Sequence, residues 1–177
     1  MRYDVPILNQ SVSPICYVVC AAMIQKYWQG TYDTTYLTGG ADPSNSCIPG
    51  ASTNDAASNG LRDAGFVLLP SPSYTMTAAH VSTLLANNGP LILIHLCANF
   101  NYGPGRGGKR PANAIGVHAV VITGIEGNAA YFNNPWGDKD VMIPVSDLMA
   151  SIAQAYAAGY DAIGYANASA MSQNIIY

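Results

Sequence analysis

The chain has 177 residues and a formal net charge of −3, with 50% hydrophobic and 10% charged residues. This balance predicts a single globular domain and excludes a disordered chain, which needs low hydrophobicity and high charge. The seven Lys and Arg residues are too few for a nucleic-acid-binding surface, and no apolar run reaches the ~20 residues that span a bilayer.

The N-terminal part of the chain predicts a helix but no Sec-type signal peptide. Residues 1–10 have no apolar stretch followed by a small-residue cleavage site, so we expect a cytoplasmic enzyme, a chain that is already processed, or an effector secreted by another route. Ser13 and Pro14 are typical of the cap and first position of a helix. We expect this helix over residues 14–28, ended by Gly30. The residues expected to face the core are Cys20, Met23, Ile24 and Tyr27.

The middle of the chain predicts a turn-rich loop, two more helices and a short strand. Thr75 or Thr77 is suited to cap the second of these helices, and Gly89 to end it. The expected elements are a loop over 31–52, a helix over 53–64, a strand over 66–70 and a helix over 75–88.

After Gly89 the sequence changes to β-branched apolar runs, which are typical of strands. A turn at Gly127–Asn128 is expected to join two of these strands as a hairpin. A late helix is expected over 146–159, with Ser146 as its cap. The expected strands are 90–96, 118–125, 129–135, 140–145 and 160–166.

Helices in the first half and strands in the second predict an α+β fold. We expect one domain over residues 1–177, with a helical lobe of about residues 1–88 packed on an antiparallel β-sheet lobe of about residues 89–177. A Gly- and Pro-rich loop over 101–116 holds three of the seven basic residues. It is either a solvated loop or a flap that recognises an acidic substrate. These basic residues are Arg106, Lys109 and Arg110.

Two of the four cysteines lie in the first expected helix. Cys16 is near its N-terminus, where unpaired backbone N–H groups and a partial positive charge favour a thiolate. Cys20 is one turn further on, where apolar neighbours raise the pKa of a thiol. Cys16 is therefore the candidate nucleophile and Cys20 a core residue. Cys47 and Cys97 are either joined in a disulfide or free thiols, and the cysteine spacings match no zinc site.

A nucleophilic cysteine needs a base, and the chain has three histidines. His80 falls inside an expected helix and His95 inside an apolar strand, so we expect both to be structural. His118 follows the Gly-rich loop and opens a strand, where its side chain can be exposed at a sheet edge. His118 is therefore the candidate base.

The base needs an orienting group and the reaction needs oxyanion donors. A hairpin would bring the segment "FNNPWG" beside His118, where an asparagine could accept from one imidazole nitrogen. Neighbouring strand residues point to opposite faces, so only one of Asn133 and Asn134 can do so. Gln10 lies six residues before Cys16 and could donate to an oxyanion together with the Cys16 backbone N–H.

These residues together resemble the papain-like cysteine peptidases. Gln10, then Cys16 followed by an aromatic residue, then His118 and "NNPWG" stand in the order of a bacterial branch. That branch includes secreted effector proteases and is similar to bacteriocin-processing peptidase domains. The resemblance covers about residues 5–145 and implies a papain-like fold with the substrate between the two lobes. Tyr17 stands where the family usually has tryptophan.

The resemblance implies a role for each residue of the motif. Gln10 would be the oxyanion donor, Cys16 the nucleophile and His118 the general base and acid. Asn134 would orient His118, because it precedes "PWG"; this branch often has aspartate there. The implied reaction is amide hydrolysis through an acyl-enzyme, without a metal or an organic cofactor. The residues expected near the substrate are Tyr17, Trp136, Arg106, Lys109 and Arg110; Trp136 is alternatively a shield over the His118–Asn134 hydrogen bond or a core residue.

Three alternatives share this scaffold. The same residues could hydrolyse peptidoglycan as an amidase or side-chain amides as a deamidase toxin. A catalytically silent binding protein would keep the fold alone. The expected partners are accordingly a peptide, protein or peptidoglycan substrate, and an inhibitor or immunity protein.

Overall fold

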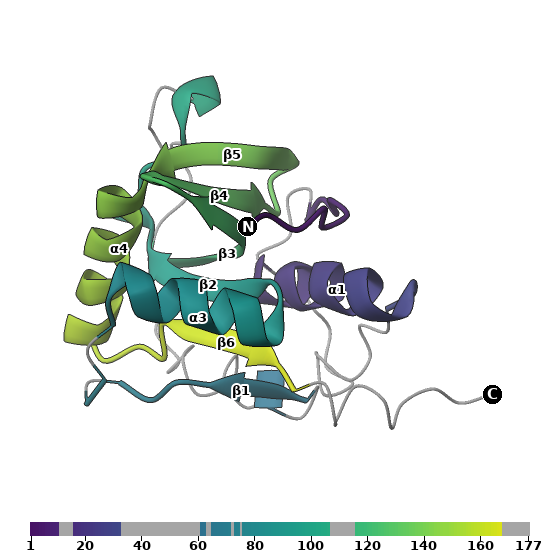
Figure 1. The fold of residues 1–177 in the computed structure, drawn as a ribbon, viewed down its shortest axis with the longest axis horizontal. Helices are drawn as coiled ribbons and strands as arrows, with labels where there is room; N and C mark the ends of the chain where they lie inside the picture. Colours follow the sequence, from purple (N-terminus) through teal and green to yellow (C-terminus); the bar gives the residue numbers. More distant parts are fainter. Residues whose placement is uncertain are drawn as a thin grey trace.

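In the computed structural model, the chain folds into a six-stranded antiparallel sheet with helices on both of its faces (Figure 1). The structure describes residues 1–10, 16–32, 61–62, 65–71, 73–74, 76–106 and 116–167. The α+β class is confirmed.

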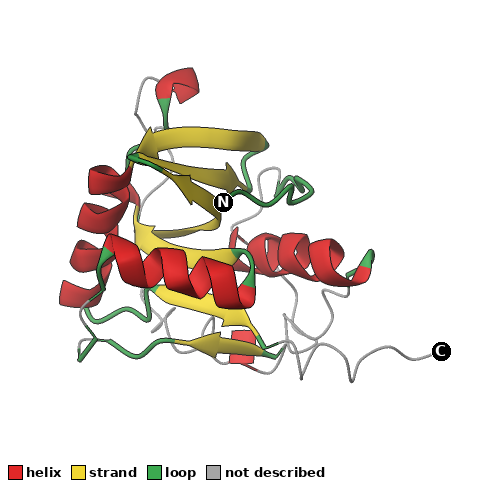
Figure 2. Cartoon of the chain, viewed as in Figure 1, coloured by secondary structure: helices red, strands yellow, loops and turns green. Residues whose placement is uncertain are grey.

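The elements follow the expected order along the described chain, and Figure 2 separates helices from strands by colour. The helices are α1 (Cys16–Gln29), α3 (Ala78–Asn88) and α4 (Val145–Ala157). The strands are β1 (Phe66–Leu68), β2 (Leu91–Leu96), β3 (Val117–Glu126), β4 (Ala129–Asn134), β5 (Asp138–Pro144) and β6 (Ile163–Ala166). Short 3₁₀ turns follow β2 at Cys97–Asn99 and Pro104–Arg106.

The strands lie in the order β1-β6-β2-β3-β4-β5, and each neighbouring pair is antiparallel. Two tight hairpins connect β3 to β4 and β4 to β5. Gly127 turns the first with a φ of 58° and Gly137 the second with a φ of 96°, values that favour glycine. β1 pairs with β6, so a segment from the first half of the chain joins the sheet. The division into lobes near residue 88 stays a prediction.

The two central strands, β2 and β3, are buried on both faces. Their side chains alternate between two core clusters, as the period of a strand requires. Ile92, Ile94, Ala119 and Val121 pack in the cluster that contains the buried face of α1. Leu91, Leu93, Val120 and Ile122 pack in the cluster that contains Val81 and Leu85 of α3 and Leu148 and Ile152 of α4.

Local capping signals determine both ends of α3 and the C-terminal end of α1. The Thr77 hydroxyl oxygen accepts from the His80 N–H at 3.3 Å and caps α3, and Gly89 ends that helix with a φ of 75°. Gly30 ends α1 with a φ of 72°, and its N–H donates to the Lys26 carbonyl at 3.0 Å. The expected cap Ser13 and the expected first helical residue Pro14 lie outside the described residues.

The cap predicted for the late helix is wrong. α4 begins at Val145, so Ser146 lies inside the helix and its hydroxyl donates to the Asp147 carboxylate at 3.3 Å. No side chain caps this helix. The Val145 N–H donates instead to the Asn128 carbonyl in the β3–β4 turn, at 3.0 Å. A backbone carbonyl of the neighbouring hairpin therefore satisfies the first N–H of α4, one of the donors that a helix N-terminus leaves without an intrahelical partner.

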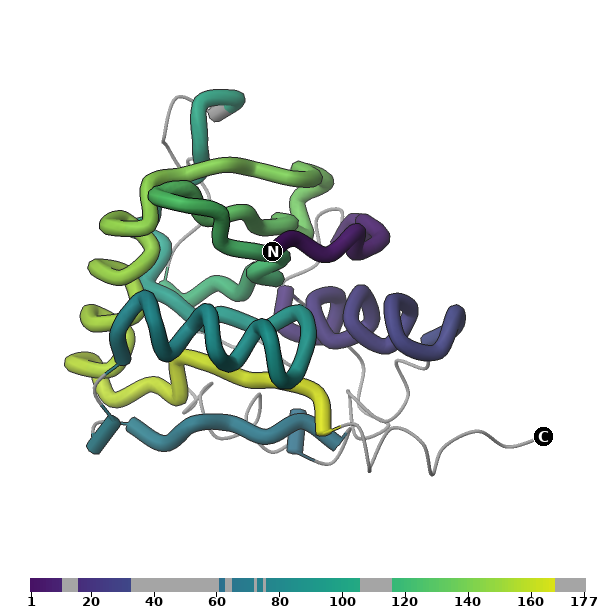
Figure 3. The backbone as a smooth tube through the Cα atoms, viewed as in Figure 1, coloured from purple at the N-terminus to yellow at the C-terminus, as the bar shows by residue number. Residues whose placement is uncertain are grey.

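The N-terminal segment runs along the sheet before it reaches α1 (Figure 3). The Tyr3 N–H donates to the Thr123 carbonyl at 2.8 Å, and the Ile125 N–H donates to the Met1 carbonyl at 3.1 Å. Gly124 is needed here, because a Cβ would collide with the backbone of the N-terminal segment. The segment is thereby held on β3.

Candidate active site

The side chain of His118 is buried between an asparagine and a tryptophan. It is the second residue of β3, and its Nε2 lies 2.9 Å from Asn134 Oδ1. The ring of Trp136 stacks on the imidazole, with ring centroids 4.0 Å apart and planes 15° apart. His118 is only 3% exposed, which corrects the expectation of an exposed side chain at a sheet edge. The cause is the β4–β5 turn, which carries Trp136 over the ring.

Asn134, and not Asn133, reaches His118. Both asparagines end β4 and both are fully buried, but their side chains follow the alternation of the strand. The Asn133 amide donates to the Val5 carbonyl and its Oδ1 accepts from the Asp140 N–H, each at 2.9 Å. Asn133 therefore ties the N-terminal segment to β5.

The hydrogen bond to Asn134 determines the protonation of the His118 ring. An amide oxygen can only accept, so Nε2 is the donor in this bond. In the neutral imidazole, Nδ1 is then the acceptor nitrogen and the one that can take up a proton. The arrangement suits a general base whose far nitrogen is held by an orienting group.

Trp136 covers the His118 ring and belongs to an aromatic cluster with Tyr102, whose ring centroid is 5.0 Å away. An aromatic face against an imidazolium contributes about 0.5–2 kcal/mol through its quadrupole, most when water is excluded. Of the sequence alternatives for Trp136, this geometry favours shielding of the His118–Asn134 pair.

Gln10 lies beside the turn that follows Asn134. The Gln10 backbone N–H donates to the Pro135 carbonyl at 2.8 Å, and Asn9 forms an isolated antiparallel bridge with Trp136. These backbone contacts bring the segment before α1 to the loop that carries Trp136. Sequence spacing alone related Gln10 to Cys16; the contact with Pro135 relates it to the His118 side of the site.

Cys16 is the first residue of α1 and its side chain is half-buried. It packs against the same core cluster as Val117, the residue before His118. The N-terminal end of a helix favours an anionic group by about 0.3–1 kcal/mol. Cys16 thus combines partial exposure with a favourable local field.

The surroundings of Cys20 disfavour a reactive thiolate. Its side chain is fully buried on the core face of α1. Burial, followed by the nearby Cys16, holds the pKa of the Cys20 thiol well above its usual value. A thiol in this environment stays protonated near neutral pH and reacts slowly. Cys97 is also buried, and Cys47 lies outside the described residues, so their pairing stays untested.

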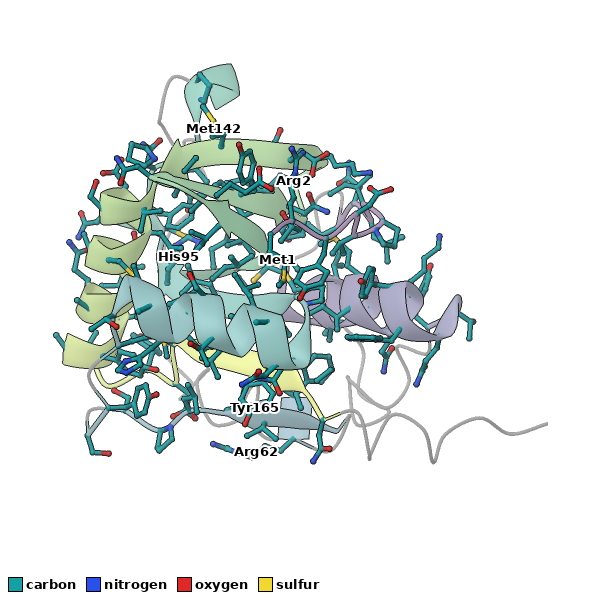
Figure 4. The ribbon with its side chains drawn as sticks, viewed as in Figure 1. Met1, Arg2, Arg62, His95, Met142 and Tyr165 are labelled. Carbon is teal, nitrogen blue, oxygen red and sulfur yellow. The ribbon has the colours of Figure 1, made fainter. Side chains whose placement is uncertain are left out.

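His95 is the cross-strand neighbour of His118 on the adjacent strand β2, a proximity that the sequence did not predict. The two residues are partners in the β2–β3 register, with ring centroids 5.5 Å apart in an edge-on arrangement. His95, labelled in Figure 4, is fully buried and stacks on Phe100 at 3.8 Å. Burial, and then His118, hold the pKa of His95 well below its usual value. His95 therefore stays neutral in the core beside His118.

The predicted substrate contacts are only partly described. Tyr17 is 5% exposed and packs in the core with α1, so it presents little surface to a substrate. Arg106 ends a 3₁₀ turn at the edge of the basic loop, and Lys109 and Arg110 lie outside the described residues. The role of these residues in substrate binding stays a prediction.

The described part of the chain contains no group of three or more His, Cys, Asp or Glu residues that could hold a metal ion. None of its helices is long and apolar enough to cross a membrane.

Comparisons with known proteins give a family match and a structure of similar fold. Residues 1–150 match the family described as papain-like cysteine protease AvrRpt2. The fold is similar to that of a protein from Bacillus anthracis described as a C39-like peptidase, with 17% identity, a TM-score of 0.57, and coverage of 93% of this chain and 95% of that chain. A double glycine motif protease from an AMS/PCAT transporter, solved with a leader peptide, is 20% identical over 93% of this chain and 91% of that chain, with a TM-score of 0.49.

A search of the curated proteins finds no matching sequence. The family match nevertheless covers most of the chain and includes Cys16, His118 and Asn134. The chain therefore belongs to the papain-like cysteine protease AvrRpt2 family and is a papain-like cysteine hydrolase.

Proposed function

We propose that the chain is a peptidase that cleaves peptide or protein substrates with Cys16 as nucleophile, His118 as general base and acid, and Asn134 as the orienting residue. The observation that carries the proposal is the 2.9 Å bond from His118 Nε2 to Asn134 Oδ1 beneath Trp136. That bond directs Nδ1 to the proton-transfer role. Membership of the peptidase family supports the same reaction.

In the proposed reaction, His118 Nδ1 takes the proton of the Cys16 thiol and the thiolate attacks the carbonyl carbon of the substrate amide. The Gln10 side-chain amide and the Cys16 backbone N–H donate to the oxyanion. The imidazolium then gives its proton to the leaving amine. Water, deprotonated by His118, hydrolyses the thioester and restores the thiol.

Both reacting residues lie at the ends of their elements. Cys16 is the first residue of α1, which packs on the face of β3 that carries Ala119 and Val121. His118 alternates with those residues and shares a face with Val120. The proposal therefore requires the Cys16 thiol to meet the imidazole at the beginning of β3, beyond the packed part of the strand. Cys16 and Val117, the residue before His118, both pack against the cluster that contains α1, so Cys16 lies on the side of the sheet that carries Val117.

The test compares Cys16→Ala with Cys20→Ala. We expect Cys16→Ala to abolish turnover and labelling by an electrophilic peptide probe, while Cys20→Ala keeps both because its thiol is buried and protonated. Turnover is measured on a peptide library and on purified cell-wall sacculi. Activity lost in a folded Cys20→Ala protein and kept in Cys16→Ala would overturn the assignment.

The choice of substrates also separates the alternatives. Peptide cleavage without release of cell-wall fragments supports the peptidase, and the reverse supports an amidase. A chain that labels no probe and cleaves nothing is a silent binding protein. A role as a secreted effector, and an inhibitor or immunity protein as partner, stay predictions.

A further inference from the structure

The orienting residue at position 134 carries an amide, and an amide can face a neighbour in two ways. A carboxylate presents two equivalent acceptor oxygens, so it orients a histidine with either one. An amide presents one acceptor and one donor. Only its oxygen can accept from His118 Nε2, so an asparagine orients the ring correctly in one of its two rotations.

Two contacts of Asn134 select the productive rotation. Its Nδ2 donates to Asp138 Oδ2 at 2.9 Å, and its Oδ1 accepts from the Trp136 backbone N–H at 3.3 Å as well as from His118. Rotation of the amide by half a turn would aim Oδ1 at the Asp138 carboxylate and Nδ2 at two other donors. The contacts with Asp138 and with the Trp136 N–H would then be repulsive, and His118 Nε2 could pair with Nδ2 only by accepting, which requires the Nδ1–H tautomer of the ring.

The hairpin between β4 and β5 holds Asp138 opposite Asn134. The two residues are paired in the strand register, so their side chains lie on the same face of the sheet. The turn between them closes with a bond from the Gly137 N–H to the Asn134 carbonyl at 2.9 Å. Asp138 is half-buried, which strengthens a bond between a charged acceptor and an amide.

We propose that Asp138 is a positioning residue that fixes the side-chain amide of Asn134 with its oxygen toward His118. It acts through Asn134 and takes no proton in the reaction. The inference rests on the proposed function, because only a catalytic His118 needs this orientation for turnover. It also accounts for how an asparagine can hold the ring in one orientation, since a carboxylate at the same position would need no second group to select an acceptor oxygen.

The test uses four variants: Asp138→Ala, Asp138→Asn, Asn134→Asp and the double variant Asn134→Asp with Asp138→Asn. The first readout is the rate at which iodoacetamide alkylates Cys16 at pH 5, followed by peptide mass mapping. An ordinary thiol with a pKa of about 8.5 is almost entirely protonated at that pH, so reaction there reports the Cys16–His118 ion pair.

Asp138→Ala should slow alkylation at pH 5 by about tenfold, because the amide is released from its fixed rotation. Asp138→Asn should stay within about threefold of the wild type, because an amide oxygen at position 138 can accept the same bond. Asn134→Asp sets two carboxylates against each other and should slow the reaction. The double variant should recover, because an amide at position 138 then donates to the carboxylate at position 134.

Asp4→Ala is the matched control, since it removes a carboxylate that is 89% exposed and bonded to Lys139, next to Asp138 in the sequence. This substitution should leave the rate of Cys16 alkylation at pH 5 unchanged. Thermal unfolding of each variant separates loss of fold from loss of orientation. The inference would be overturned if Asp138→Ala were alkylated at the wild-type rate, or if Asp138→Asn lost as much as Asp138→Ala. It would also be overturned if the double variant were alkylated no faster than Asn134→Asp.

A second readout distinguishes failure of this inference from failure of the proposed function. Ring ¹⁵N shifts of His118 are measured above neutral pH in the Cys16→Ala background, where no thiolate keeps the ring doubly protonated. They are assigned by comparison with His118→Gln and report which nitrogen carries the proton. Asp138→Ala should increase the Nδ1–H tautomer even if Cys16 proves unreactive; an unchanged tautomer overturns the inference. Slow alkylation of the wild-type Cys16 at pH 5 would instead count against the proposed ion pair.

Discussion

Replacing Asn134 with alanine is the most direct test of the orientation of His118, the proposed base. Asn134→Ala removes the acceptor that lies 2.9 Å from His118 Nε2 and leaves the Trp136 ring stacked on the imidazole. The ring stays buried but loses its orienting partner. Because Asn134 is 0% exposed, it cannot touch a substrate, so we expect kcat to fall while KM changes little.

The size of the effect follows from the charge that His118 carries during the reaction. A hydrogen bond to a charged group contributes about 1.5–3 kcal/mol, and about 1.4 kcal/mol is a factor of ten in rate. Loss of the Asn134 bond should therefore reduce kcat/KM about 10- to 100-fold. The retained Trp136 stack keeps the loss below that of removing His118 itself.

Asn133→Ala is the control for this experiment. Asn133 is equally buried in the same strand, and its two bonds go to Val5 and Asp140 instead of His118. Its truncation should cost about 1–3 kcal/mol of stability, measured by thermal unfolding, with unchanged kcat/KM per folded molecule. The assay is the pH dependence of kcat/KM on a peptide selected from the library. A folded Asn134→Ala protein with wild-type kcat/KM, or an equal loss in Asn133→Ala, would refute the reasoning.

Two other perturbations test the surroundings of this pair. Gln10→Ala should reduce kcat on the same peptide about 10²- to 10³-fold if its amide donates to the oxyanion, while the backbone bond to Pro135 keeps the fold; a loss confined to KM would contradict this role. Burial and His118 depress the pKa of His95, so below about pH 6.5 the unfolded chain binds a proton that the folded chain does not. The free energy of unfolding therefore falls by up to about 1.4 kcal/mol per pH unit as the pH is lowered. His95→Phe removes this proton uptake and keeps an aromatic ring against Phe100, so its Tm should fall less than that of the wild type between pH 7 and pH 5; equal falls would show that His95 does not cause the dependence.

Local sequence signals were sufficient for most of the described elements. Thr77 and Gly89 bounded α3 as predicted, because a capping hydroxyl and a left-handed glycine act within one turn of the chain. Apolar β-branched runs predicted β2 and β3 because both are buried on two faces. Ser146 failed as a cap because α4 begins one residue before it, at Val145, whose N–H donates to the Asn128 carbonyl in the β3–β4 turn, a contact that no local pattern contains.

The active site shows the same difference between features that the local sequence predicts and features that depend on tertiary contacts. Residue type and order alone were enough to predict Cys16, His118 and Gln10, because a nucleophile, a base and an oxyanion donor each require a particular kind of side chain. The choice between Asn133 and Asn134, the burial of His118 under Trp136 and the His95 partner depended on strand register. So did the contact of Asp138 with Asn134. Chemistry is a property of single residues and can be read along the chain, whereas orientation is set by cross-strand pairs that only the folded sheet brings together.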